Sequence, residues 1–201
     1  TLSSSSAASD VYKRQDVLPE IPGLSEMWGT RVFHCPYCHG HEVNGKNLGV
    51  VGGKNPGFIT RIATLLTKWA SRVTLYPNGM DLSPEQRELF ERYGVDLAVD
   101  DVSRVSPVTD DDHAVEITTG SGSIRYDACF TGPEFKPNDE LLRGAGCTVA
   151  DGWVQVEGGK TSEPGLWAVG NVVSSPDQVS QALGSGAAIA IAIDQHLFDQ
   201  S

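Results

Sequence analysis

The sequence predicts an α/β protein built around a Rossmann-type parallel sheet, and three observations lead to this prediction. Short apolar strands alternate with amphipathic helices over roughly fifty residues in the order β-α-β-α-β. A glycine-rich turn joins the first of these strands to the first helix, and a long helix rich in Ala, Gly and Ser lies near the end of the chain. This order is typical of the mononucleotide-binding half of a doubly wound sheet.

The alternating segment begins with an apolar strand at residues 48–51, followed by the glycine turn. Apolar residues then recur at helical spacing over residues 58–69, which predicts an amphipathic helix. A second strand is expected at residues 73–76, where Pro77-Asn78-Gly79 ends it, and a third at residues 95–99.

The helix between the second and third strands has clear sequence boundaries. Ser83 is expected to cap its N-terminus, with Pro84 at the first helical position and Gln86 completing a capping box. Gly94 marks its end. The remaining elements are shorter, apart from the last. Strands are expected at residues 102–105, 114–118, 123–125, 126–131 and 152–156, and a final helix at residues 178–197.

Composition excludes several classes of function. The 201 residues carry a formal net charge of −11, from 15 basic and 26 acidic side chains, so no basic surface is expected for nucleic acid or an anionic membrane. The longest apolar run, residues 187–193, is too short to span a bilayer. Four cysteines do not form a disulfide framework, since Cys129 and Cys147 stand alone; this usage suits a reducing, cytoplasmic location.

The N-terminal region is expected to lie outside the folded domains. Residues 1–15 are rich in Ser and Ala, lack an apolar core, and look like a translated sequencing adaptor, so they are assigned to a non-native, disordered scar. Residues 16–29 contain Pro19, Pro22 and Gly23 and are expected to be a linker. The natural protein is accordingly expected to extend further at its N-terminus.

The segment His34-Cys35-Pro36-Tyr37-Cys38-His39 carries the strongest chemical signal in the chain. A Cys-x-x-Cys pair cycles between dithiol and disulfide when the first thiolate is stabilised at the start of a helical turn. Cys-x-x-Cys-His is also the pattern of c-type haem attachment, and the flanking His34 and His41 make zinc a further alternative. A redox dithiol, with His39 as proton donor or acceptor, is the preferred interpretation; no metal ligands are assigned.

The glycine turn is a candidate nucleotide site. Gly52-Gly53-x-x-x-Gly57 follows a strand and opens a helix, where pyrophosphate oxygens meet unpaired backbone N–H groups. Lys54 stands at the second glycine position of the usual fingerprint, and Asn55 completes the candidate set. The second strand ends in neither an acidic residue for NAD nor an arginine for NADP, so nicotinamide binding is weakly supported.

These motifs together resemble the low-molecular-weight thioredoxin reductase family. The similarity lies in IPG…WG…HCPYCHG-x-E-V, VVGG-x-N, TS-x-PGLWAVGNV and QVSQALGSGAAIAI, and it extends from Asp16 to the C-terminus. It implies two Rossmann-like three-layer domains, of which the FAD-binding one is incomplete here. Residues 30–125 would form the NAD(P)-binding-like domain with the cysteine pair, and residues 126–201 the C-terminal half of the FAD-binding domain.

The resemblance also implies roles for individual residues. Cys38 would face the flavin, and Cys35 would exchange with the external disulfide. Gly170, Asn171 and Val172 match the segment that holds the FAD ribityl and pyrophosphate region, while Gln178 and Val179 match residues near the isoalloxazine ring.

Four departures separate this chain from ordinary thioredoxin reductases. His39 stands in place of an acidic proton donor, Asn171 in place of an aspartate and Lys54 within the nicotinamide fingerprint, and the arginine clamp is missing. The first and last of these suggest the dithiol-oxidase branch, which passes electrons to oxygen.

The expected function is therefore a flavin-dependent thiol–disulfide oxidoreductase. FAD is the expected cofactor, and NADPH, NADH or oxygen the electron partner. The substrate would be a thioredoxin-like protein or a small-molecule dithiol or disulfide, and the full-length enzyme a homodimer. The 201-residue chain alone is expected to bind FAD poorly and to be inactive. The alternative is a non-catalytic nucleotide-binding α/β module whose cysteines are structural or bind zinc.

Overall fold

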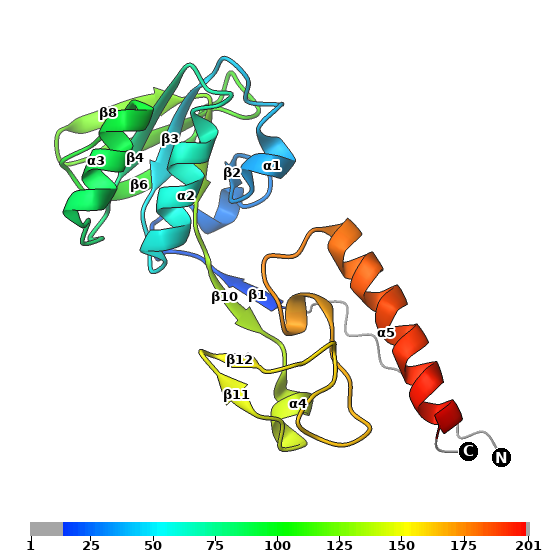
Figure 1. Ribbon diagram of the computed structural model, residues 1–201. Coiled ribbons are helices and arrows are strands. Elements are labelled where there is room, and N and C mark those ends of the chain that lie inside the picture. The colour runs from blue at the N-terminus through cyan, green and yellow to red at the C-terminus, as the bar shows by residue number, and fades with distance from the viewer. Residues whose placement is uncertain (1–13, 200–201) are drawn as a thin grey trace. The chain divides into compact units, whose positions relative to one another are not determined.

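The computed structural model describes residues 14–199 (Figure 1). The strands are β1 (Arg14–Val17), β2 (Val32–Phe33), β3 (Asn47–Val51), β4 (Arg72–Tyr76), β5 (Val95–Leu97), β6 (Val102–Pro107), β7 (Val115–Thr119), β8 (Gly122–Tyr126), β9 (Ala128–Thr131), β10 (Glu134–Pro137), β11 (Val149–Ala150) and β12 (Trp153–Val154). The helices are η1 (Ser25–Met27), α1 (Pro36–His39), α2 (Pro56–Leu66), α3 (Pro84–Tyr93), α4 (Glu140–Gly144), η2 (Gly170–Val172) and α5 (Val179–Asp199).

The chain divides into two compact units, residues 17–134 and residues 135–201 with the N-terminal segment up to Asp16. Both crossings between the units fall within strands that pair with each other, β1 and β10. None of the described helices combines the length and hydropathy that crossing a membrane requires.

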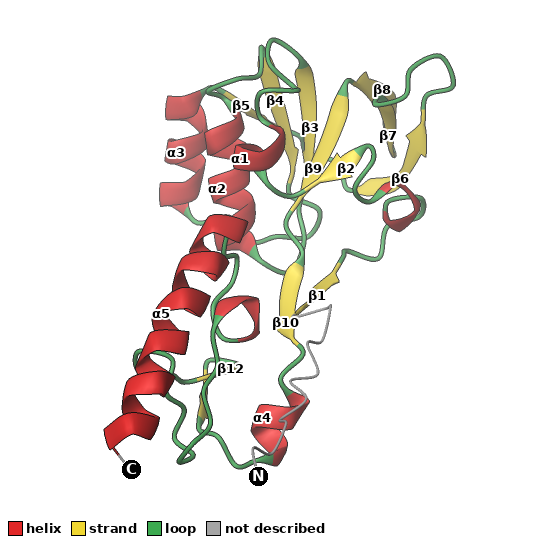
Figure 2. Cartoon of the chain, turned by 90° about the vertical axis from the view of Figure 1, so that its right-hand side faces the viewer, coloured by secondary structure: helices red, strands yellow, loops and turns green. Residues whose placement is uncertain are grey.

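The unit of residues 17–134 is a three-layer α/β fold, which confirms the predicted fold class. Its parallel sheet has the order β2-β9-β3-β4-β5, and a second, antiparallel sheet has the order β6-β7-β8. Figure 2 shows α2 and α3 on one face of the parallel sheet and β6–β8 on the other. The helices α2 and α3 and the strands β3, β4 and β5 lie close to where the sequence predicts them.

Side-chain alternation along the strands builds a core on each face of this sheet. In β4, Val73 and Leu75 pack toward the helices, whereas Tyr76 packs toward the antiparallel sheet. In β9, Phe130 packs toward the helices and Cys129 toward the antiparallel sheet. Successive residues of a strand point to opposite faces, so a short apolar strand supplies both layers.

The local signals for α3 are confirmed in detail. The Ser83 hydroxyl accepts a hydrogen bond from the backbone N–H of Gln86, and the Gln86 side chain accepts one from the N–H of Ser83. Gly94 adopts a left-handed backbone with φ of +69° and ends the helix. A residue with a Cβ is strained in that conformation.

The predicted domain boundaries differ from the structure in three places. Residues 126–131 were expected in the second domain, but Tyr126 ends β8 and residues 128–131 form β9 between β2 and β3 of the parallel sheet, so the unit ends at Glu134. The expected linker of residues 16–29 is packed: Leu24 and Met27 are buried in the core under β6 and β7. This packing depends on partners far along the chain, which the proline and glycine punctuation does not reveal.

The third difference concerns the N-terminal region. Residues 1–13 of the expected scar lie outside the described residues, but Arg14 and Gln15 belong to β1. The guanidinium of Arg14 donates to the Asp16 carboxylate at 2.9 Å and to the Ser175 hydroxyl at 2.7 Å, and it lies 4.0 Å from the centre of the Phe135 ring. Arg14 is therefore part of the packed structure.

The second unit has a small core of its own. Leu142, Cys147, Val154 and Ala168 form its buried cluster, and α5 contributes no buried residue. Its regular structure includes most of the paired strands β1 and β10, the β11–β12 hairpin, the short helices α4 and η2, and the 21-residue α5.

Candidate redox-active site

The cysteine pair lies at the start of a short helix that follows an edge strand of the parallel sheet. Cys35 is the N-cap of α1, and Pro36 occupies the first helical position, where its missing N–H costs nothing. Cys35 and Cys38 form a disulfide with their Cα atoms 5.3 Å apart, within the usual range. The pairing predicted from the Cys-x-x-Cys spacing is confirmed.

The backbone around the pair favours a thiolate on Cys35. The N–H of Cys38 donates to the Sγ of Cys35 at 3.2 Å. A hydrogen bond of this kind stabilises the sulfur more strongly when it is charged than when it is neutral. Cys35 is half-buried and Cys38 is exposed, so an external thiol or disulfide has access to the pair.

Gly40 fixes the end of α1 against the neighbouring helix. A Cβ on Gly40 would lie 2.5 Å from the Pro36 carbonyl oxygen and 2.7 Å from the Trp69 ring, so only glycine fits. Tyr37, between the two cysteines, is 62% exposed. The motif therefore combines one tightly packed position with one exposed aromatic side chain.

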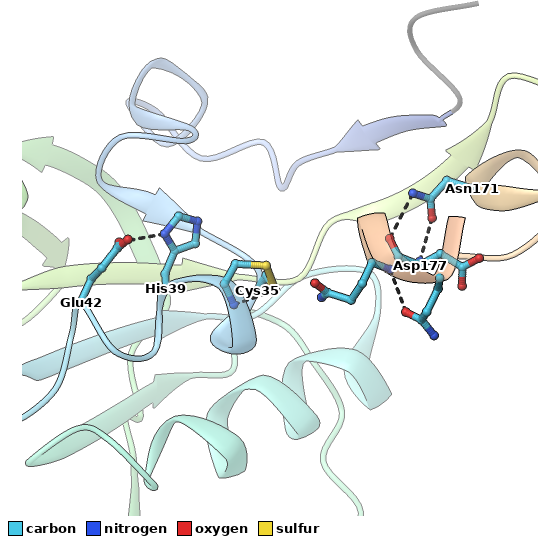
Figure 3. The surroundings of a disulfide bond; sticks show 8 residues. Cys35, His39, Glu42, Asn171 and Asp177 are labelled. Atoms are coloured by element: carbon cyan, nitrogen blue, oxygen red, sulfur yellow. Dashed lines mark hydrogen bonds and ion pairs between the residues drawn. A yellow bond between two sulfur atoms is a disulfide. The ribbon is translucent and has the colours of Figure 1, made fainter. Parts of the chain in front are cut away.

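His39 is held in place by two contacts. Its ring stacks on Phe33 with the centroids 4.2 Å apart, and its Nδ1 lies 3.0 Å from Oε2 of Glu42 (Figure 3). The hydrogen bond to His39 is the main cause that lowers the pKa of the Glu42 carboxyl. The sequence analysis did not identify Glu42 as a site residue. The signal that points to it is an acidic residue three positions after His39, in the turn that follows α1.

The other two histidines of the motif have different surroundings. His34 stacks on Trp28 with the ring centroids 5.4 Å apart, and His41 is exposed. Zinc binding would need three or four converging ligands. The residues from 14 to 199 contain no group of three His, Cys, Asp or Glu side chains placed to hold a metal.

The glycine turn lies between β3 and α2 as predicted. A Cβ on Gly52 would meet the Pro77 carbonyl oxygen, so this glycine allows two strand ends to approach closely. Asn55 is the N-cap of α2, and its side chain accepts the N–H of Phe58 at 3.1 Å. Pro56 has no N–H, so among these first-turn residues only Gly57 keeps an amide for a phosphate. Gly53 is half-buried and Lys54 exposed.

The predicted flavin-binding residues lie together in the second unit. Gly170 has φ of +75° and begins η2, which contains Asn171 and Val172. The Asn171 side chain accepts the N–H of Asp177 at 2.8 Å and donates to its carbonyl at 3.3 Å. This amide therefore fixes the loop that leads into α5.

Gln178 and Val179, at the start of α5, are both exposed. The N–H of Gln178 donates to the Gln181 side chain at 2.8 Å. The first amides of a long helix have no intrahelical partners and favour an anionic group. These residues and the cysteine pair belong to different units, and each group is described separately.

Comparison with known proteins places these features in a family. The family model described as pyridine nucleotide-disulphide oxidoreductase matches residues 14–186. The chain belongs to this family. Its members bind FAD and take electrons from NAD(P)H. The resemblance to thioredoxin reductases inferred from the motifs is thereby confirmed.

The family membership is accompanied by specific similarities. The chain is 29% identical over 191 residues to an alkyl hydroperoxide reductase protein of Pseudomonas putida, covering 90% of this chain and 36% of that protein. The solved structure of HlmI matches with 37% identity and a TM-score of 0.85, over 92% of this chain and 58% of HlmI. Thioredoxin reductase from Streptococcus pyogenes shares the fold, with 23% identity and a TM-score of 0.76 over 92% of this chain and 63% of that chain.

The residues present fit the family's flavin better than its nicotinamide nucleotide. The positive φ of Gly170 lets the backbone approach a ligand closely, and Val179 at the start of α5 is exposed. The turn at Gly52 offers the single first-turn amide of Gly57, and the Lys54 side chain is exposed. The chain spans 36% of the length of the Pseudomonas putida relative.

Proposed function

We propose that this protein is a flavin-dependent thiol–disulfide oxidoreductase in which the Cys35–Cys38 pair passes electrons between a dithiol or disulfide substrate and FAD. The observation that carries the proposal is the accessible disulfide at the start of α1, in a member of the pyridine nucleotide-disulphide oxidoreductase family. The adjacent His39–Glu42 pair supports it, because thiol–disulfide exchange moves a proton at each step.

Each residue of the site has a part in this proposal. Cys35 exchanges with the substrate, since the N–H of Cys38 stabilises its thiolate. Cys38 exchanges electrons with the flavin, and His39 donates or accepts the thiol proton. The backbone of Gly170, Asn171 and Val172 and the helix start at Gln178 and Val179 would hold FAD. When bound, the flavin supplies a two-electron acceptor for the dithiol.

The electron partner of the flavin is NADPH, NADH or oxygen. The single first-turn amide at Gly57 and the uncharged Pro77-Asn78-Gly79 after β4 favour weak nicotinamide binding. We therefore favour the dithiol-oxidising direction, with oxygen accepting the electrons. The substrate class is a thioredoxin-like protein or a small-molecule dithiol or disulfide, the assembly a homodimer and the location the cytoplasm.

The potential of the cysteine pair tests the core of this proposal. The chain is equilibrated in glutathione or dithiothreitol buffers of known potential, and the reduced fraction of Cys35 and Cys38 is counted by alkylation and mass spectrometry. A midpoint between about −180 and −280 mV is the range of catalytic dithiols. A midpoint below about −300 mV would identify a structural disulfide and contradict the proposal.

The flavin and its electron partner need a second measurement. Because the 201-residue chain alone is expected to bind FAD poorly, flavin reduction by a dithiol is followed anaerobically in the FAD-bound full-length enzyme, in the wild type and in Cys38→Ser. Reduction that depends on Cys38 supports the flavin role, and reduction that is independent of Cys38 contradicts it. Rates with NADPH and NADH, measured beside oxygen consumption, then identify the electron partner.

A further inference from the structure

The hydrogen bond between His39 and Glu42 determines which ring nitrogen of the histidine carries the proton. A glutamate carboxyl is ionised at neutral pH at its ordinary pKa, and the hydrogen bond to His39 lowers the pKa of Glu42 further. An ionised carboxylate only accepts hydrogen bonds. The contact of 3.0 Å between Nδ1 and Oε2 therefore requires the proton on Nδ1, which leaves the lone pair of a neutral ring on Nε2.

The orientation of the ring is fixed at the same time. Phe33, from β2 at the edge of the parallel sheet, stacks on the imidazole at a centroid distance of 4.2 Å and an interplanar angle of 29°. Glu42 holds one edge of the ring, and in Figure 3 the imidazole lies between Glu42 and the disulfide. A ring held by its face and by one edge has little rotational freedom left.

We propose that Glu42 is a positioning residue, which fixes the Nδ1–H tautomer of His39 so that Nε2 exchanges protons with the thiols that react at Cys35 and Cys38. This inference rests on the proposed function. It assigns Glu42 a part in the reaction although its side chain is 66% exposed and would otherwise count as a surface ion-pair partner.

The step it serves is the attack of a substrate thiol on the disulfide. The thiol sulfur bonds to Sγ of Cys35, and the bond between Cys35 and Cys38 breaks. Cys38 leaves with the electron pair as a thiolate. The thiol proton moves to Nε2 of His39, and the resulting imidazolium is stabilised by the Glu42 carboxylate. A mixed disulfide on Cys35 is formed, and the reverse step returns the proton.

Other titratable groups near this pair do not replace Glu42. His41, on the same segment, and His113, from the loop before β7, act on the Glu42 carboxyl electrostatically and only weakly compared with His39. His113 contacts the Thr30 carbonyl at 3.3 Å through its own Nδ1. Glu42 is the acidic side chain that contacts the His39 ring.

The tautomer of His39 is measured directly on the full 201-residue chain. Long-range ¹H–¹⁵N spectra of histidine-labelled protein distinguish a ring protonated on Nδ1 from one protonated on Nε2. The Nδ1–H form is expected in the wild type and in Glu42→Asp, and its loss in Glu42→Ala. Glu88→Ala is the matched control, because Glu88 is an exposed partner of an ion pair on α3. An unchanged tautomer in Glu42→Ala would overturn the proposal.

The rate of exchange supplies an independent readout. The oxidised chain reacts with a small thiol at about pH 6.5, where little thiolate is present and a proton acceptor matters. Loss of a positioning partner is expected to slow this reaction about 10- to 100-fold in Glu42→Ala, with partial recovery in Glu42→Asp and no change in Glu88→Ala. Melting temperatures are measured for each variant to show that the fold is kept.

The two proposals fail in distinguishable ways. If His39→Ala exchanges as fast as the wild type, the acid–base role in the proposed function is wrong, and the role of Glu42 falls with it. If His39→Ala is slow but Glu42→Ala is as fast as the wild type, the proposed function stands and the positioning role alone is overturned.

Discussion

At the scale of single residues, the sequence predicts some contacts of the cysteine site and misses others. The pairing of Cys35 with Cys38 was predictable because both lie in one helical turn, where spacing alone brings them together. The interaction of His39 with Glu42 depends on how the turn after α1 folds, and that of Asn171 with Asp177 on a loop. The i, i+3 spacing of His39 and Glu42 allows their contact, but residue types and spacing alone do not show that either contact forms.

A buried pair of tyrosines is another contact that the sequence does not predict, and it gives the first testable prediction. Tyr76 of β4 and Tyr126 of β8 are 50 positions apart, are both 2% exposed, and share a hydrogen bond of 2.8 Å between their hydroxyls. Replacing Tyr76 by Phe leaves the Tyr126 hydroxyl without this partner and is expected to cost about 1–3 kcal/mol of unfolding free energy. The double variant Tyr76→Phe/Tyr126→Phe should recover part of that loss in urea denaturation, and a strictly additive result would contradict the coupling.

The same tyrosine predicts a pH dependence at the alkaline end. Burial, followed by the hydrogen bond to Tyr126, raises the pKa of Tyr76 above its ordinary value near 10. The native state therefore holds this proton more tightly than the unfolded chain does. Its contribution to stability is complete below about pH 10 and falls as the pH rises from there toward the higher native pKa. Stability of the wild type should fall more steeply above about pH 10 than that of Tyr76→Phe.

At the scale of elements, local sequence signals were sufficient to predict the ends of a helix that carries its own capping residues. Ser83, Gln86 and Gly94 predict both ends of α3, and the structure has both. The segment before β2 was misassigned, since Pro19, Pro22 and Gly23 suggest a linker. Leu24 and Met27 are nonetheless buried against β6 and β7, and the N–H of Val105 donates to the Pro22 carbonyl at 2.9 Å. Local sequence patterns do not predict the packing of a segment whose partners lie about eighty residues away.

The glycines of the β3–α2 turn give the third prediction, because Gly52 and Gly57 differ in how much space surrounds them. A Cβ at Gly52 would collide with the backbone oxygen of Pro77, whereas a Cβ at Gly57 would meet nothing within 4 Å. Gly52→Ala is expected to destabilise the unit of residues 17–134 by about 3 kcal/mol, the upper end for overpacking. Gly57→Ala lies in the first turn of α2 and should be neutral or stabilising by up to about 1 kcal/mol. Equal effects in urea denaturation would show that the turn is not closely packed.

For the whole molecule, the two units differ greatly in how much core each one has. Residues 17–134 contain two large apolar clusters, one on each face of the parallel sheet. Residues 135–199 contain one cluster of four buried residues, and α5 leaves Leu183, Ile191 and Phe198 exposed. The motifs in the sequence predicted two domains. The size of each core, however, depends on which strands pair, and β9 belongs to the unit of residues 17–134 instead of the second unit.

This difference predicts that the isolated 201-residue chain unfolds in two steps. The unit with the smaller core should open at lower urea, because burial of apolar surface supplies most of the stabilising free energy. Hydrogen exchange in increasing urea should release the amides of α5 and β12 before those of β3 and β4. Trp153 and Trp167 report on the first step by fluorescence, and Trp28 and Trp69 on the second. Gly52→Ala should lower only the second midpoint, since its clash lies within residues 17–134. A single transition, in which all these probes coincide and Gly52→Ala shifts every one of them, would show instead that the units stabilise each other as one cooperative body.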